Sequence, residues 1–438
     1  MTDEVSQQSP SQKIGFWGVW SLTVGCMIGS GIFLLPSVLA PYGMLAIAGW
    51  LVTAAGAIAI AVVIGRLAVR SPRSGGAAIF VRDAYGDTAG FIAGWSLWVS
   101  YVISIPAVAM AFVGYLGSVV PGISSSIILQ VGAAATLIWT LTAIALRGIR
   151  EAAITTIALT ILKLIPLVAV IGLATIFSSP TELPATEMPD TGLLAALAST
   201  ALLTMWAFLG LEAGTVATES VADPARTLPR AVAFGVIAVT LVYILSTLAV
   251  MMLVPPETLA VSEAPFVEAT RILGGAGSTL IAFGAMASTC GALLAIIFVT
   301  GHLAYGMAKD GLVPGAFSKK SGSDVPQNAL ILGAVLGTVL LMLNASEGLL
   351  GAFTFLLMMS TATALLPYLL CALAELKHSW RVSMAWITLA FVAAMYSLFA
   401  LVGSGISVLL WGALLLFSGV PIYLYNRNEE NKRSRTQD

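Results

Sequence analysis

The sequence predicts an all-α membrane protein with twelve transmembrane helices. Of its 438 residues, 58% are hydrophobic and only 9% are charged. A typical soluble domain carries about 25% charged residues, so this chain has too little charge to cover a water-facing surface of its size. Its apolar runs are long enough for helices to cross a bilayer. The alternation of apolar and polar residues that is typical of a membrane β-barrel is absent from the sequence.

Twelve apolar segments are the candidate helices. They are 14–40, 43–66, 86–118, 125–146, 154–178, 193–221, 229–254, 273–305, 328–344, 347–374, 382–402 and 404–426. The segments 86–118 and 273–305 are longer than a bilayer requires, so we expect these helices to tilt or to protrude from the membrane.

Basic residues predict the orientation of these helices. All but two of the 20 Lys and Arg residues lie in segments on the side of the N-terminus, the exceptions being Arg271 and the intrahelical Lys163. The loop 178–190, on the opposite side, holds three acidic residues and no Lys or Arg. Lys and Arg are enriched in cytoplasmic loops. We therefore expect a multi-pass protein of the inner (cytoplasmic) membrane with both termini in the cytoplasm.

Two of the segments are interrupted near mid-membrane. The first contains Gly29-Ser30-Gly31, and the sixth weakens at Leu209-Gly210-Leu211. Broken backbone at this depth is tolerated only where it is buried in protein or lines a cavity. Its free N–H groups suit a carboxylate, and its free carbonyls suit an ammonium group. The breaks therefore predict a site for a small zwitterion, although glycines that pack helices closely are the alternative explanation.

The spacing of the breaks also predicts an internal repeat. They lie five helices apart, an odd number, so two halves built around them would face opposite ways across the membrane. The first repeat would cover 14–178 and the inverted second repeat 193–374. The last two helices, 382–426, would lie outside the repeat, between cytoplasmic tails at 1–13 and 427–438.

Several motifs resemble those of the amino acid–polyamine–organocation (APC) superfamily of transporters. The likeness is greatest to its arginine/agmatine and basic amino acid/polyamine antiporter group. The motifs are GSGIFLLP (Gly29–Pro36), GGAAIFVRDAYG (Gly75–Gly86), WAFLGLEA (Trp206–Ala213), DPARTLPRA (Asp223–Ala231) and AKDGLVP (Ala308–Pro314). The first and third are fairly specific, and together the five span most of the chain in the family's order.

The resemblance implies a LeuT-like fold, which is a five-plus-five inverted repeat with helices 1 and 6 unwound at mid-membrane. It also implies that N–H groups of the first break hold the substrate carboxylate, while carbonyls of both breaks face its amine. The residues concerned are Ser30 and Gly31 for the carboxylate, and Met27, Trp206 and Leu209, beside Gly210, for the amine. Trp206 would close one side of the site, unless it is an ordinary buried or interfacial aromatic residue.

Two positions depart from the arginine/agmatine antiporter pattern. Ile105 replaces an asparagine in helix 3 that meets the guanidinium group, and Ile296 replaces a tryptophan in helix 8. With Val108, these residues would form an apolar distal pocket. A guanidinium group buried there would lose water without gaining hydrogen bonds, so we expect neutral or apolar amino acids as substrates. Basic amino acids or polyamines are the alternative.

Two ionisable residues at membrane depth are candidates for proton coupling or gating. Glu212 directly follows the second break, where burial would favour uptake of a proton under mild acid; its alternative role is to hold loose backbone as a permanently protonated acid. Lys163 resembles the lysine that several sodium-independent superfamily members place where sodium-coupled relatives bind a cation. Its alternative is a lysine that reaches toward a helix end. Transport without sodium is therefore expected.

The most consistent function is secondary active transport of amino acids by alternating access, through antiport or proton symport. A polytopic membrane enzyme would need a catalytic constellation that the sequence lacks, and a channel would need a repeated polar pore lining. No cofactor, metal site or nucleic-acid partner is expected, and the partners are the small-molecule substrate and the lipid bilayer. The exact substrate and the oligomeric state, a homodimer included, stay open.

Overall fold

Among the residues that the structure describes, the regular elements are all helices. The computed structural model describes residues 15–29, 31–71, 75–147, 152–178, 192–212, 221–320 and 325–435. In the first half, the long helices and half-helices are α1 (Phe16–Met27), α2 (Gly31–Leu39), α3 (Met44–Arg70), α5 (Asp87–Val119), α7 (Ile127–Leu146) and α8 (Ala152–Phe177). In the second half they are α9 (Leu193–Met205), α10 (Pro224–Leu253), α13 (Gly274–Lys309), α14 (Gln327–Leu343), α15 (Gly348–Ser379), α16 (Met384–Val402), α17 (Gly405–Phe417) and α18 (Gly419–Arg435).

Short helices join these elements. They are η1 (Ala40–Tyr42), α4 (Ala77–Tyr85), α6 (Pro121–Ser124), η3 (Trp206–Phe208), α11 (Pro256–Leu259), α12 (Pro265–Ala269), η6 (Arg271–Leu273), η7 (Gly315–Ser318) and η8 (Ala345–Glu347). Of these, α4, α6, α11, α12 and η7 lie in stretches that the sequence analysis left outside its twelve segments.

Eight helices among the described residues are long and apolar enough to cross a membrane. They are α3, α5, α7, α10, α13, α15, α16 and the run from α17 into α18. The pair α1 and α2 makes a ninth span if its two halves, bent by 50°, are taken together. The chain is therefore a multi-pass membrane protein. The expected length of two helices is confirmed, because α5 has 33 residues and α13 has 36, or about 50 Å each at 1.5 Å per residue.

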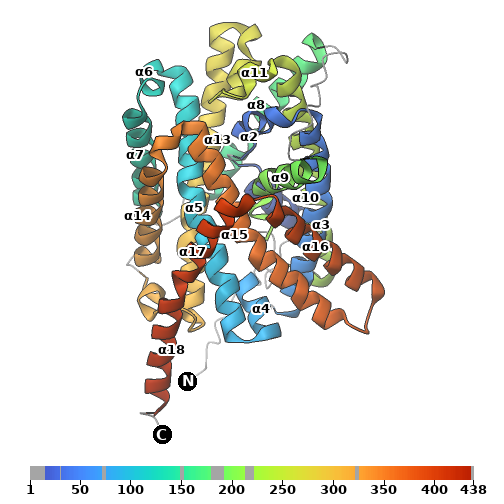
Figure 1. The fold of residues 1–438 in the computed structure, drawn as a ribbon, viewed down its shortest axis with the longest axis vertical. Coiled ribbons are helices and arrows are strands. Elements are labelled where there is room, and N and C mark those ends of the chain that lie inside the picture. The colour runs from blue at the N-terminus through green and yellow to red at the C-terminus, as the bar shows by residue number, and fades with distance from the viewer. Residues whose placement is uncertain are drawn as a thin grey trace, which may run out of the picture.

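Helix α5 lies at the centre of the bundle (Figure 1). It packs along α15 and α13 and also contacts α7, α14 and α4. Its contact with α15 includes a buried polar cluster in which Ser360 Oγ lies 3.1 Å from Ser100 Oγ and 2.8 Å from Ser104 Oγ. Hydrogen bonds between hydroxyl groups of neighbouring helices stabilise helix packing inside a membrane, because lipid tails are as apolar as the side chains and burial of apolar surface gives little driving force there.

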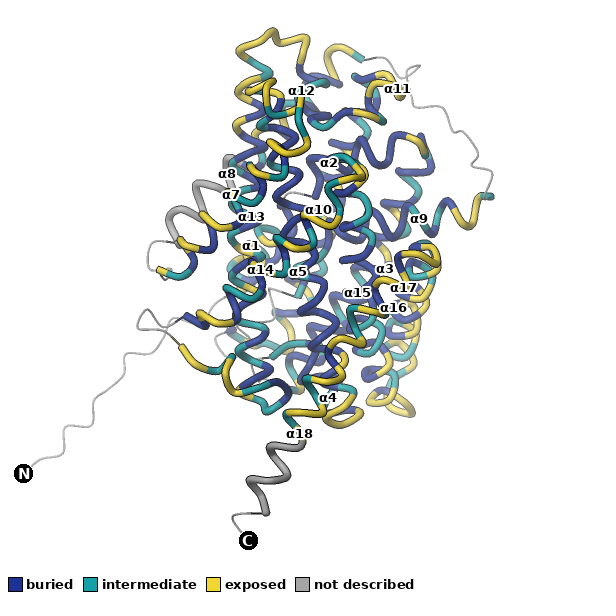
Figure 2. The backbone as a smooth tube through the Cα atoms, turned by 60° about the vertical axis from the view of Figure 1, so that its left-hand side comes forward, coloured by how far each residue is buried: buried dark blue, intermediate teal, exposed yellow. Residues whose placement is uncertain are grey.

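The two ends of the bundle differ. Figures 1 and 2 place α4 and α18 at one end, and α11, α12 and α2 toward the other. At the α4 end, the carboxylate of Glu375 is fully buried and lies 3.2 Å from Arg66 Nη1 and 2.7 Å from Arg70 Nη1. Ser379 Oγ donates to the same carboxylate at 2.5 Å. These contacts tie α3 to α15 at the arginine-rich end.

Exposed residues, yellow in Figure 2, lie on the periphery of the bundle, and many of them are large and apolar. Ile128 on α7, Val402 on α16 and Phe417 on α17 are each at least 70% exposed. An exposed apolar surface of this extent marks an interaction surface, which for a multi-pass membrane protein is the lipid.

Glycines allow α3 to approach α9 and α16 closely. A Cβ atom added at Gly56 would lie 2.1 Å from Cγ of Tyr396, and one added at Gly49 would lie 2.5 Å from Thr200. The Tyr396 ring is held in place, because its hydroxyl lies 3.1 Å from both Thr53 Oγ1 and the Ala201 carbonyl oxygen and can bond to either. The position of α3 therefore depends on having no side chain at Gly56.

We expect Gly56→Ala to lower the free energy of unfolding by about 1–3 kcal/mol, the usual range for overpacking a tight interior. Gly132→Ala is the matched control, since nothing lies within 4 Å of a Cβ at that glycine. Thermal unfolding of both variants in the same detergent checks the prediction. Equal midpoints for Gly56→Ala and Gly132→Ala would contradict this packing.

Candidate transport site

The first predicted helix is broken at the glycines that the sequence analysis singled out, between α1 and α2. Helix α1 ends at Met27, and the N–H of Ile28 still donates to Val24 O at 2.9 Å. Helix α2 begins at Gly31 and lies 50° away from α1. Ser30, predicted to hold the substrate carboxylate, lies outside the described residues. Because α2 begins within the bundle, the free N–H groups of its first turn are available to an anion.

The second break also falls at its predicted glycine. After α9, the short helix η3 ends at Phe208, and Leu209 is extended with ψ 135°. Gly210 then adopts φ +96°, a positive value that residues with a side chain rarely adopt. The backbone therefore cannot continue as a helix past Leu209 and turns toward Glu212.

The two breaks meet each other. A Cβ atom at Gly31 would lie 3.2 Å from Cε3 of Trp206, so the start of α2 packs directly on the indole ring. A Cβ atom at Gly210 would lie 3.6 Å from Cβ of Cys26. The structure therefore brings four predicted site positions (Met27, Gly31, Trp206 and Gly210) to one place in the bundle.

Tyr243 of α10 links both breaks. Its ring is fully buried, and its hydroxyl lies 2.5 Å from Met27 O and 3.3 Å from Ala207 O. The shorter contact gives the last carbonyl of α1 a donor in place of the helical N–H that it lost at the break. Met27 O, expected to face the substrate amine, is therefore already bonded to the protein through one of its two lone pairs.

Two tyrosines hold the carboxylate that follows the second break. Tyr101 Oη of α5 donates to Glu212 Oε1 at 2.6 Å, and Tyr368 Oη of α15 donates to Glu212 Oε2 at 2.8 Å. Hydrogen bonds to a carboxylate are shorter and stronger than those between neutral groups. The pair fixes Glu212 between α5 and α15 beside the broken helix.

Lys163 reaches the first break. The side chain is only 7% exposed, and its ammonium group donates to Gly25 O at 3.3 Å. Cys26, the next residue, lies within electrostatic reach of both Lys163 and Glu212. The two ionisable residues predicted at membrane depth therefore both lie near the end of α1.

The site is covered on one side. Trp206 is 5% exposed and packs edge-on against Phe353 of α15, with ring centroids 5.4 Å apart. Cys26, on the α1 side of the meeting point, is exposed. Among the described residues, aromatic rings therefore cover the Trp206 side, whereas Cys26 on the other side is exposed.

The three residues of the predicted distal pocket lie on α5 and α13, and one of them packs against α14. Ile105 is fully buried, and its Cγ2 lies 2.9 Å from where a Cβ at Gly337 would be, with its Cδ1 3.8 Å from the same point at Gly333. Its side chain thus packs against α14 rather than toward the breaks. Val108 is likewise fully buried in α5. On α13, Ala292 approaches Gly29, and Ile296 is half-buried one turn further along.

Broken helices that meet inside a bundle of membrane-spanning helices are typical of transporters. The chain belongs to the amino acid permease family, whose model matches residues 14–424. This membership confirms the resemblance to the APC superfamily drawn from the sequence motifs.

Several curated relatives match nearly the whole chain. The putrescine transporter PotE of Escherichia coli is 32% identical over 426 residues, which cover 95% of this chain and 96% of the relative. A putative arginine/ornithine antiporter of Bacillus subtilis is 31% identical over 471 residues, covering 97% and 99%. The cadaverine/lysine antiporter of Escherichia coli is 32% identical over 343 residues, covering 76% of each chain. All three are named as transporters, so the chain is a transporter and not an enzyme.

We expect Tyr243→Phe to destabilise the protein by about 1–3 kcal/mol, the cost of leaving a buried partner unsatisfied, because Met27 O would lose its donor. Substrate binding should weaken as well, since both breaks lose their link. Tyr423→Phe is the matched control, because that hydroxyl bonds the exposed Thr88 at 3.0 Å. Thermal unfolding with and without substrate measures both effects, and a Tyr243→Phe protein as stable and as responsive as the control would refute this role.

Proposed function

We propose that the protein is a sodium-independent antiporter of basic amino acids or polyamines. One observation carries this proposal: the Glu212 carboxylate, fixed by two tyrosines, lies where the two broken helices meet. The relatives named above for putrescine, arginine, ornithine, cadaverine and lysine support the same substrate class. A half-buried carboxylate at this place favours a substrate amine that arrives as a cation, since charge-assisted hydrogen bonds are the stronger ones.

This proposal replaces the neutral substrate that the sequence analysis expected. That expectation depended on Ile105 as an apolar wall facing the substrate side chain. With Ile105 directed at Gly333 and Gly337 of α14, the strongest argument against a cationic side chain is lost. The basic amino acid or polyamine alternative is therefore preferred.

In the proposed cycle, the substrate amine lies near the free carbonyls of the breaks, and a carboxylate, if present, lies at the first N–H groups of α2. Contact between Trp206 and Phe353 closes the site on one side, while the exposed Cys26 marks the open side. Movement of the half-helices that opens the first side and closes the second would complete an exchange. The roles of Ser30 and Leu209 in binding are part of this proposal.

The proposed architecture has twelve spans and an inverted repeat. Three shorter apolar helices, Lys163–Phe177, Leu193–Phe208 and Gln327–Leu343, support twelve spans when they are added to the eight long helices and the bent pair. The repeats would be 14–178 and 193–374, as the sequence predicts. The arginine cluster around Glu375 supports a cytoplasmic position for the α4 end, and with it cytoplasmic termini.

Counterflow in proteoliposomes tests the substrate class. We expect external arginine, ornithine, lysine, putrescine or cadaverine to exchange with the same compound inside, and leucine, methionine and alanine to compete at least tenfold more weakly. The reason is that Glu212 gives a cation a partner that an aliphatic side chain lacks. Competition by leucine as strong as that by the best cation would overturn the proposal.

We expect exchange to be unaffected when choline replaces sodium, because the Lys163 ammonium supplies a positive charge against Gly25 O. Lys163→Ala should then lose at least tenfold in exchange rate while the protein keeps its elution volume in size-exclusion chromatography. Lys309→Ala, at the end of α13, serves as the control for loss of a lysine. A steep dependence of wild-type exchange on sodium would contradict this role for Lys163.

A further inference from the structure

Three aromatic rings pack against one another beside the second break. Trp50 of α3, Phe208 of η3 and Tyr243 of α10 are each fully buried. The ring centroids of Trp50 and Tyr243 lie 5.2 Å apart, and Phe208 lies 5.9 Å from Trp50 and 5.8 Å from Tyr243. Tilted and edge-to-face pairs at about 4.5–7 Å attract each other beyond the burial of their surface. Together these three residues form the ring cluster.

The ring cluster reaches both breaks through one hydroxyl group. Tyr243 Oη lies 2.5 Å from Met27 O and 3.3 Å from Ala207 O. A tyrosine hydroxyl has a single proton, so it donates to one of these carbonyls at a time. How far each carbonyl is left available to a substrate amine therefore depends on the position of the Tyr243 ring.

Trp50 stands on a fixed stretch of α3. Three residues further along this helix, Thr53 Oγ1 lies 2.6 Å from Thr204 Oγ1 of α9. Helix α9 leads directly into η3 and the second break, so this contact fixes α3 beside the break. The indole ring is therefore held next to the Tyr243 ring and limits how far that ring can turn.

The indole ring acts by its shape and not by a hydrogen bond. Trp50 Nε1 is buried and makes no hydrogen bond with any described residue. Leaving a buried donor without a partner is unfavourable. A substitution that keeps an aromatic ring but removes this N–H group therefore loses no hydrogen bond.

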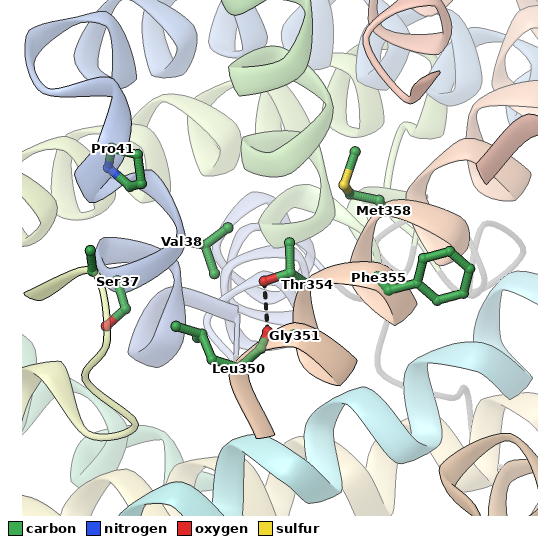
Figure 3. Close-up of a pocket in the computed structure, with 9 residues that line it drawn as sticks. Ser37, Val38, Pro41, Leu350, Gly351, Thr354, Phe355 and Met358 are labelled. Carbon is green, nitrogen blue, oxygen red and sulfur yellow. Dashed lines mark hydrogen bonds between the residues drawn. The ribbon is translucent and has the colours of Figure 1, made fainter. Parts of the chain in front are cut away.

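The ring cluster is enclosed by protein. The pocket in Figure 3 lies elsewhere, between α2 and α15, where Val38, Leu350 and Met358 are among its lining residues. None of the three rings lines that pocket. A change at Trp50 therefore reaches the transport site through the side chains that its ring touches.

We propose that Trp50 is a positioning residue for the transport site, whose ring holds Tyr243 so that the hydroxyl stays between Met27 O and Ala207 O. Without the indole ring, Tyr243 can turn, and the two carbonyls lose the donor that fixes them. The substrate amine then meets misplaced carbonyls. This inference rests on the proposed function only in that the amine binds at the breaks.

Substrate dissociation constants of the purified full-length protein test the proposal. The probes are labelled arginine, putrescine and leucine, and the one that wild type binds most tightly is used for every variant. Binding of leucine alone would contradict the proposed substrate class and leave this test intact.

We expect Trp50→Leu to raise the dissociation constant about fivefold, the value of one hydrogen bond. Trp50→Phe should stay within about twofold of wild type, because it keeps a ring against Tyr243. Trp50→Met, whose flexible side chain adapts to the space, takes the place of Trp50→Leu if that variant does not fold. Wild-type affinity in the variant without a ring would overturn the proposal, as would an equal loss in Trp50→Phe.

Trp95→Leu is the matched control for loss of a buried indole ring. Trp95 packs against Trp98 with ring centroids 4.9 Å apart, and its Nε1 donates to Leu415 O at 3.2 Å, away from both breaks. This variant should have a lower unfolding midpoint and a dissociation constant within about twofold of wild type. An equal loss of affinity in Trp95→Leu and Trp50→Leu would show that affinity follows stability alone.

A double-mutant cycle with Tyr243→Phe separates positioning from packing. If Trp50 acts through the Tyr243 hydroxyl, Trp50→Leu should change the dissociation constant by less than about twofold once that hydroxyl is gone. The full loss of affinity on top of that caused by Tyr243→Phe would show that the indole ring does not act through Tyr243.

Discussion

The need to satisfy broken backbone inside a membrane governs the centre of this protein. Without water, every freed N–H and C=O group at that depth must find a partner in the protein or in a ligand. Tyr243 supplies a donor to the last carbonyl of α1, and Lys163 supplies another to Gly25 O. Both donors come from distant helices, so the break is stable only within the assembled bundle. The backbone groups left over are the ones that a substrate can use.

The charged residues at the centre follow from the same constraint. A lone lysine or carboxylate in the bundle would be costly, yet each is held: Lys163 by a carbonyl, and Glu212 by the hydroxyls of Tyr101 and Tyr368. Because the tyrosines stand on α5 and α15, any motion of the second break changes their hold on Glu212. The site thus joins charge, break and helix packing in one network, in which the proposed cationic substrate would take part.

Much of this centre is predictable from the sequence, and the rest has a physical reason for being hidden. Glycine placement located both breaks, and isolated charges singled out Lys163 and Glu212. The tyrosines were missed, because a buried tyrosine in an apolar helix cannot be told from another core residue until its hydrogen-bond partner is known. The partner of the Tyr243 hydroxyl, Met27 O, lies 216 residues away in the sequence. The packing of Ile105 against α14 could not be read from the sequence, because alignment gives a position in a helix and not the direction in which its side chain points.

The central claim is that the two breaks touch each other, and a disulfide between them tests it most directly. The Cβ atoms of Cys26 and of a residue at position 210 would lie 3.6 Å apart, within the range of about 3.5–4.5 Å that a disulfide spans. Gly210→Cys should therefore cross-link to Cys26 under mild oxidation and stop exchange until a reductant is added. Gly210→Ser controls for the strain of a side chain at φ +96°. A folded Gly210→Cys protein that keeps both thiols free under oxidation would show that the breaks lie apart.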